Sequence, residues 1–172
     1  AQWFPALERI AQEKHWRLIS LTKSACPSVW ATPYRQELGR KYEECDRWRS
    51  SVIDRVTRER PALVVLANGA GHVEGAAPFS GTKVSQGIDP AEWQKGMEET
   101  LARLRPSGAA VVILRDTPLP GFDVPTCLSK AAWRGQDLLQ TCSFGRDQAL
   151  NQHVYEIEQR AAKGLGHASV VD

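Results

Sequence analysis

The sequence lacks any apolar run long enough to cross a membrane, and it carries almost no net charge. Its longest mainly apolar stretches, Leu63–Ala67 and residues 109–114, fall far short of the roughly 20 residues that a transmembrane helix needs. Its 22 basic and 20 acidic residues leave a formal net charge of +2, which does not provide the basic surface on which phosphate-backbone binding depends. We therefore expect neither a membrane-spanning segment in these residues nor a nucleic-acid partner.

Sequence motifs for metals, redox chemistry and nucleotides are also missing. The four histidines show neither HxH nor HExxH spacing, and no two cysteines form a CxxC pair, so we expect no metal site and no cofactor. Gly69, Gly71 and Gly75 do not form GxGxxG and do not open a helix. This spacing argues against a dinucleotide site.

The chain has the length and composition of one globular domain. Its 172 residues, 42% apolar and 24% charged, predict a single domain with one core over residues 1–172. It starts with Ala rather than Met, and its opening AQWFPALERIAQEK is amphipathic without the apolar core of a signal peptide. We therefore expect a segment cut from a longer protein.

The four cysteines form two pairs that are local in the sequence. Cys26 stands near Cys45, and Cys127 stands near Cys142. We predict two disulfides, which would place the domain in an oxidising compartment. The alternative is four free thiols in a reducing compartment.

Apolar periodicities alternate between helix and strand along the chain. This alternation predicts an α/β fold with a doubly wound parallel sheet, right-handed crossovers and helices on both faces. Ligands of such sheets bind beyond the carboxyl ends of the strands. The expected helices cover residues 3–11, 36–60, 90–104 and 147–163, and the expected strands cover residues 17–22, 63–67, 110–114 and 170 onward.

Three polar residues follow the expected strands. Asn68 precedes Gly69, where the backbone allows close approach of a ligand, and its amide can donate to the oxyanion of an acyl transfer; the alternative is an Asn that suits a turn. Ser24 lies in a turn whose backbone N–H groups can add oxyanion donors, or it is an ordinary loop residue without a base beside it. Asp116 either orients a substrate or base, or caps a turn before Pro118.

Three ring side chains are candidates for contacting a substrate. His72 is the histidine placed nearest to Asn68, either as a base or substrate contact or as an exposed loop residue. Trp30 and Trp133 lie in the expected loops, where an indole can stack on a carbohydrate, whereas the other tryptophans mostly occupy core positions of helices.

Four segments of the chain resemble one known family. These segments are AQWFPALERIAQEKHWRLISLTKSACPS, YEECDRWR, RPALVVLANGAG and VVILRDTPLPGFDVPTCLS. In this order they resemble the SGNH-hydrolase-like domain at the C-terminus of bacterial acyltransferase family 3 membrane proteins. The resemblance implies a flavodoxin-like SGNH sheet whose first strand lies upstream of residue 1. It also implies an extracytoplasmic domain, tethered to the membrane by a membrane domain outside this chain, and the two cysteine pairs fit such an exported domain.

The resemblance also indicates which catalytic parts these residues lack. The family's nucleophilic serine lies in a GDSH motif, which would stand immediately before Ala1, and its histidine lies in a DxxH motif downstream of Asp172. Asn68 corresponds to the Asn block that donates to the oxyanion. Ser24 and Ala25 occupy roughly the place of a second oxyanion block, where the family typically has Gly. We therefore expect a domain truncated at both ends and inactive alone.

Two functions from different classes follow. The first is an O-acyltransferase or esterase domain that acts on cell-envelope glycans through a serine outside this chain, with an acyl donor and a polysaccharide or peptidoglycan as partners. The alternative is a non-catalytic glycan-binding or interaction domain of the same fold, which would use Trp30, Trp133 and the loop of residues 69–87. A GDSH motif before Ala1 and a DxxH motif after Asp172 would favour the enzyme.

Overall fold

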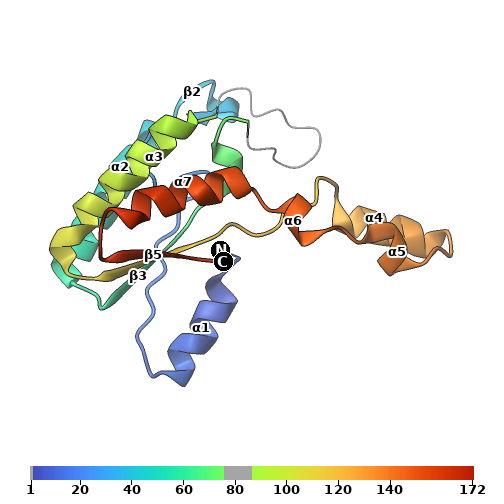
Figure 1. Cartoon of the computed structure of the whole chain (residues 1–172), viewed down its shortest axis with the longest axis horizontal. Helices are drawn as coiled ribbons and strands as arrows, with labels where there is room; N and C mark the ends of the chain where they lie inside the picture. The colour runs from blue at the N-terminus through green and yellow to red at the C-terminus, as the bar shows by residue number, and fades with distance from the viewer. Residues whose placement is uncertain (1, 76–86) are drawn as a thin grey trace.

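The computed structural model describes residues 2–75 and 87–172, and its centre is a parallel sheet (Figure 1). The sheet has the strand order β3-β4-β5, formed by β3 (Leu63–Ala67), β4 (Ala110–Leu114) and β5 (Ala168–Val171). Val64 pairs with Val111, and Val111 pairs with Ala168. Both pairings are parallel, so the expected α/β fold with a parallel sheet is confirmed.

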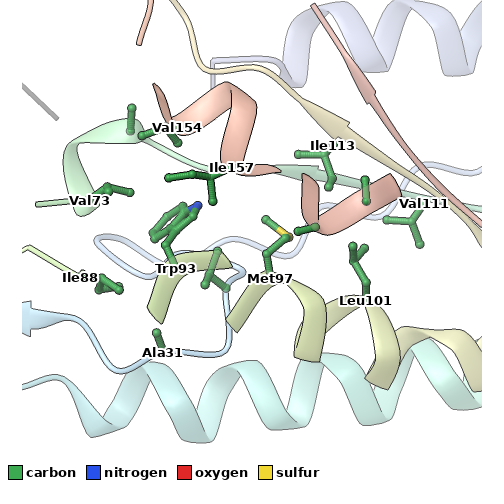
Figure 2. Close-up of a cluster of buried hydrophobic side chains, with 14 of the residues drawn as sticks. Ala31, Val73, Ile88, Trp93, Met97, Leu101, Val111, Ile113, Val154 and Ile157 are labelled. Atoms are coloured by element: carbon green, nitrogen blue, oxygen red, sulfur yellow. The ribbon is translucent and has the colours of Figure 1, made fainter. Parts of the chain in front are cut away.

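One face of this sheet carries the hydrophobic core. Helices α3 (Pro90–Leu104) and α7 (Gln152–Lys163) pack on each other and cover the face that presents Val111 and Ile113. Helix α2 (Glu43–Glu59) lies behind α3 in the same layer and adds Ile53 to the core. Figure 2 shows the centre of this core, where Trp93, Met97, Leu101, Val111, Ile113 and Ile157 meet.

The opposite face of the sheet is more open. Because strand side chains alternate between faces, Leu63 and Val171 point away from the core, and they are 40% and 46% exposed. Helix α1 (Phe4–Glu13) lies on this side of the sheet in Figure 1, but its Phe4 and Ile10 remain exposed. In the described ranges the helices therefore bury one face thoroughly and leave the other partly uncovered.

The segment of residues 17–22, expected to be a strand, forms neither helix nor strand. A strand exists only through hydrogen bonds to a neighbouring strand, and among the described residues the outer edge of β3 has no partner. Leu18 and Ile19 in this segment are both exposed. Residues 17–22 have the composition of a strand, but no neighbouring strand among the described residues pairs with them.

The helix expected over residues 36–60 begins later than its periodicity predicts. Residues before it form a small hairpin, in which β1 (Tyr34–Arg35) pairs antiparallel with β2 (Arg40–Lys41) around the 3-10 turn η1 (Gln36–Leu38). Gly39 closes that turn with φ +63°, a left-handed conformation that suits glycine. Helix α2 then starts at Glu43.

Residues 118–146 contain short helices where no helix is expected, and the helix expected over residues 147–163 is interrupted at Leu150 and Asn151. Figure 1 shows α4 (Val124–Trp133) and α5 (Leu138–Cys142) as a hairpin that projects from the rest of the molecule, followed by α6 (Arg146–Ala149). The 3-10 turns η2 (Ala70–His72) and η3 (Arg105–Ser107) complete the elements given for the described ranges.

Both predicted disulfides are confirmed. Cys26 is bonded to Cys45 and Cys127 to Cys142, with Cα–Cα distances of 5.4 Å and 5.9 Å. The first links the loop after residue 22 to α2, and the second links the two helices of the projecting hairpin. Within residues 2–75 and 87–172, no helix has the length and apolarity that a bilayer span requires.

Candidate functional site at the carboxyl end of the sheet

Asn68 directly follows β3, and its side chain is held by two segments distant in sequence. Its Oδ1 accepts hydrogen bonds from the backbone N–H and the hydroxyl of Ser28, both at 2.8 Å. Its Nδ2 donates to Oε1 of Glu158 on α7, at 3.3 Å. These partners identify which atom of the amide is oxygen and which is nitrogen, because Ser28 offers two donors and Glu158 offers an acceptor carboxylate. The side chain is therefore held in one orientation.

The loop that carries Ser28 is itself fixed by a buried arginine. Arg49 of α2 is 3% exposed and donates to the carbonyl oxygens of Pro27, at 3.1 Å, and Ala31, at 2.9 Å. It also pairs with Asp46 at 2.9 Å. Burial lowers the pKa of this guanidinium, and Asp46 acts in the opposite direction. The arginine thus binds both ends of the Ser28 loop to α2.

Helix α3 holds the same loop from the other side. The hydroxyl of Thr100 donates to the carbonyl of Ser28 at 2.8 Å, and Trp30 donates its backbone N–H to the carbonyl of Gly96 at 3.0 Å. A Cβ atom at Gly96 would lie 2.8 Å from a methyl of Val29 and 2.9 Å from the Trp30 carbonyl. Glycine is required there because the loop backbone approaches the helix too closely for any side chain.

Asp116 follows β4 and fixes the chain just beyond Asn68. Its Oδ2 accepts the backbone N–H of Ala70 at 2.7 Å, and its Oδ1 accepts that of Thr117 at 2.8 Å. The carboxylate therefore holds the 3-10 turn η2 against the end of β4. Of the two roles considered for Asp116, the structure shows the turn-holding one directly, and it also places this carboxylate beside the Asn68 pocket.

A pocket opens at this edge of the sheet, beyond the carboxyl ends of β3 and β4. Ligands of parallel α/β sheets bind at such an edge. Thr117 also donates its hydroxyl to Gln2 at 2.7 Å, which brings the start of the chain to the pocket. Its lining residues are Gln2, Trp3, Ala67, Asn68, Gly69, Gly71, Asp116, Thr117 and Leu119.

His72 lies at the end of η2 and is half-buried rather than exposed. Its ring stacks on Trp93, with centroids 6.5 Å apart and planes 16° apart. Burial lowers the pKa of this histidine, and the nearby charge of Asp116 acts in the opposite direction. A lowered pKa keeps the imidazole neutral at pH 7, the form in which it can accept a proton.

Glu158 is a residue of this site that our sequence reading missed. It lies on α7 among the inward-facing Val154, Ile157 and Ala161, and it is only 3% exposed. Burial, aided by the charge of Asp116, raises the pKa of Glu158 to about 7, whereas the hydrogen bond from Asn68 and the nearby indole N–H of Trp93 lower it. An acidic residue inside an apolar helical stripe was the available signal.

The other predicted site residues lie elsewhere. Ser24 is exposed in a turn where Cys26 donates to the carbonyl of Lys23, and it does not line the pocket. The ring of Trp30 is covered by the guanidinium of Arg103, 3.8 Å from its centroid. Trp133 is 85% exposed at the end of α4 in the projecting hairpin.

The structure brings Ser28 to Asn68 in the place where we expected Ser24. Nothing in the spacing of Ser28 marked it, because its contact with Asn68 spans 40 residues. In the part of the chain that the structure describes, no three His, Cys, Asp or Glu side chains are grouped so that they could hold a metal ion.

These features define an α/β domain with an oriented amide donor at the ligand-binding edge of a parallel sheet. A family model described as the SGNH domain fused to AT3 domains matches residues 1–172. The chain therefore belongs to this family, whose character is that of a hydrolase or acyltransferase. The two disulfides and the family's fusion to AT3 membrane domains are consistent with an extracytoplasmic domain. Comparisons with curated proteins and with solved structures gave no match.

Proposed function

We propose that the chain forms the oxyanion side of an SGNH acyl-transfer site that modifies cell-envelope glycans. The observation that carries this proposal is the orientation of Asn68. With Oδ1 occupied by Ser28 and one Nδ2 hydrogen donated to Glu158, the amide keeps a second hydrogen for a ligand. An oriented donor of this kind stabilises the tetrahedral oxyanion without reorganisation during the reaction.

The proposed reaction has two acyl-transfer steps. A serine Oγ attacks the acyl carbonyl while a histidine takes the serine proton, and the carbonyl oxygen becomes an oxyanion that accepts the Asn68 N–H. Collapse of this intermediate breaks the bond to the donor, and the histidine returns the proton to that leaving group. A hydroxyl of a polysaccharide or of peptidoglycan then attacks the acyl-serine while the histidine takes its proton. The bond between the acyl carbon and the serine Oγ breaks, the histidine returns the proton to Oγ, and the acyl group remains on the glycan; water in place of the glycan hydroxyl gives hydrolysis.

The serine and the histidine of this proposal come from segments outside residues 1–172. Residues 1–172 contain neither a GDSH motif nor a DxxH motif. In this proposal they supply the oxyanion donor and the pocket. Asp116 serves to hold the loop after Asn68, and Gly69 allows the ligand to approach the backbone. The domain is tethered to the membrane by the AT3 part of the parent protein.

The same proposal includes a doubly wound sheet whose first strand pairs with the free edge of β3. Three features support it: β3 has no partner on that side among the described residues, Leu63 is 40% exposed at this edge, and residues 17–22 have strand composition without strand pairing. An inserted strand would give both β3 and residues 17–22 a neighbour.

The first prediction concerns Asn68 and tests the proposed function. The chain is extended on both sides to include the serine and histidine motifs, and turnover of an activated acetyl ester is measured. We expect Asn68→Ala to lower kcat by about 10² to 10³-fold, the usual loss when one oxyanion donor is removed. Residues 1–172 alone should give no turnover.

The control is Asn151→Ala, at a half-buried position before α7 whose residue does not line the pocket. Asn151 caps α7 by accepting the N–H of Val154, so its loss costs about 1 kcal/mol of stability but should leave kcat unchanged. An Asn68→Ala enzyme with full kcat, or Asn68-dependent turnover by residues 1–172 alone, would contradict the proposal.

A non-catalytic glycan-binding domain remains the second candidate because Trp133 is 85% exposed. Trp30 supports it less, since Arg103 covers its ring, and residues 76–86 of the loop invoked for it lie outside the described residues. Titration with peptidoglycan fragments, followed by tryptophan fluorescence, distinguishes the two. Binding that Trp133→Ala abolishes, together with an extended protein that shows no turnover, would favour this candidate.

A further inference from the structure

The Asn68 amide has one hydrogen-bonding position left after its contacts are counted. A primary amide accepts up to two hydrogen bonds at its oxygen and donates two from its nitrogen. Ser28 fills both acceptor positions, through its N–H and its hydroxyl. Glu158 takes one donor position. The single remaining N–H belongs to a side chain that lines the pocket. Its direction depends on Glu158, because Glu158 holds the other hydrogen of the same NH₂ group.

Glu158 is a costly residue for a helix to bury. An ionisable carboxyl at 3% exposure loses most of its hydration, and such groups are normally paired with a cation. Among the described residues no Lys, Arg or His forms an ion pair with it. Its neighbours on the same face of α7 are Val154, Ile157 and Ala161. Packing alone would favour an apolar residue at this position.

The groups that face Glu158 come from three other elements. Asn68 donates to it from the end of β3, the buried indole of Trp93 reaches toward it from α3, and Asp116 contributes a negative charge from the end of β4. Trp93 Nε1 has no hydrogen bond of ordinary geometry in the described ranges. His72 stacks on that same indole. The carboxyl therefore has hydrogen-bond donors beside it but no cation.

We propose that Glu158 is a positioning residue, whose carboxyl accepts one Asn68 hydrogen and thereby aims the other into the pocket. This inference rests on the proposed role of Asn68 as an oxyanion donor. Without the acceptor, the amide keeps its Ser28 contacts but is free to tilt about them. The structure also makes the contact sensitive to pH, because the pKa of Glu158 lies at about 7 and an ionised carboxyl is the stronger acceptor.

The test follows the Asn68 side-chain NH₂ group directly, by ¹⁵N NMR of residues 1–172. Its resonances are assigned from their loss in Asn68→Ser. We expect the wild-type resonances to titrate with a midpoint near pH 7. We expect Glu158→Gln, which keeps an acceptor oxygen but cannot ionise, to hold the resonances at constant positions across that range. Glu158→Leu removes the acceptor, and its Asn68 NH₂ should exchange with water faster by about 10-fold or more.

The matched control is Glu156→Gln, an exposed glutamate on the same helix that accepts from Gln152. It should leave the Asn68 titration unchanged. In the extended protein, kcat should fall about 10-fold in Glu158→Leu at unchanged KM, and Glu158→Gln should restore it to within about 2-fold of wild type. Rescue by Gln separates positioning from mere packing, because Leu fills the space equally well.

Two results would overturn the inference: an Asn68 NH₂ whose exchange with water is unchanged in Glu158→Leu, or a titration of that NH₂ group that persists in Glu158→Gln. These NMR results do not depend on turnover. Suppose that Glu158→Gln removes the titration but Asn68→Ala keeps full kcat. The contact between Glu158 and Asn68 would then stand, but Asn68 would not be an oxyanion donor and Glu158 would have no positioning role.

Discussion

At the scale of single residues, the site depends on polar groups that are buried with their partners. Arg49 makes the largest such set, because it joins the carbonyls of Pro27 and Ala31 to Asp46. These bonds fix the loop whose Ser28 orients Asn68. A buried arginine can do this because its planar guanidinium carries five donors in a rigid arrangement.

Arg49→Leu should therefore destabilise the domain strongly. It leaves two buried carbonyls without these donors, and we expect the free energy of unfolding to fall by about 3 kcal/mol. Arg49→Lys should be intermediate, because one ammonium cannot reach all three partners. Urea unfolding measures the effect. Arg47→Leu, on the same helix with a 68% exposed side chain, should cost less than about 0.5 kcal/mol; equal losses at positions 47 and 49 would contradict the argument.

At the scale of elements, the two disulfides stabilise different parts of the fold. Cys26–Cys45 links the Ser28 loop to α2, whereas Cys127–Cys142 links α4 to α5 inside the projecting hairpin. Their sequence separations of 19 and 15 residues predict similar stabilisation, about 3 kcal/mol each, from loop entropy. The difference lies in which part of the fold each one supports.

Replacing each pair by alanine should show this difference. Cys26→Ala with Cys45→Ala should lower hydrogen-exchange protection throughout β3 and β4, because the loop packs on α3 and contacts Asn68. Cys127→Ala with Cys142→Ala should lower protection only within residues 124–142, because α4 and α5 pack mainly on each other. Loss of protection in the sheet from the second pair would show that the hairpin is part of the central folding unit.

At the scale of the whole molecule, stability should depend on pH through Glu158. Its pKa is raised to about 7 in the folded chain from an ordinary 4.5, so the folded state retains a proton that the unfolded state loses first. Stability is therefore greatest below pH 4.5 as far as this group is concerned, and it declines as pH rises toward 7. The shift corresponds to about 3 kcal/mol.

Urea unfolding at pH 5 and pH 8 measures this dependence. Wild type should lose stability between the two values, and Glu158→Gln should lose about 2.5 kcal/mol less, because glutamine carries no proton to release. Glu156→Gln should behave as wild type. An identical decline in wild type and Glu158→Gln would assign the pH dependence to other groups.

Sequence patterns alone predicted the α/β class, the two disulfides, the helix start at Pro90 and the position of Asn68 at the end of a strand, and the structure agrees with each. These features depend on local periodicity, capping and nearby residues, which are read directly along the chain. The resemblance to SGNH domains fused to acyltransferase 3 proteins was also visible there, and the family comparison confirmed it.

The residues that surround Asn68, in contrast, could be identified only from the folded chain. Ser28 and Glu158 stand 40 and 90 residues from it, and no local pattern predicts which distant polar groups share a buried site. The same reason explains residues 17–22, whose composition predicts a strand, although a strand forms only where a neighbouring backbone supplies its hydrogen bonds. Local chemistry selects the elements, and packing between distant segments selects their partners.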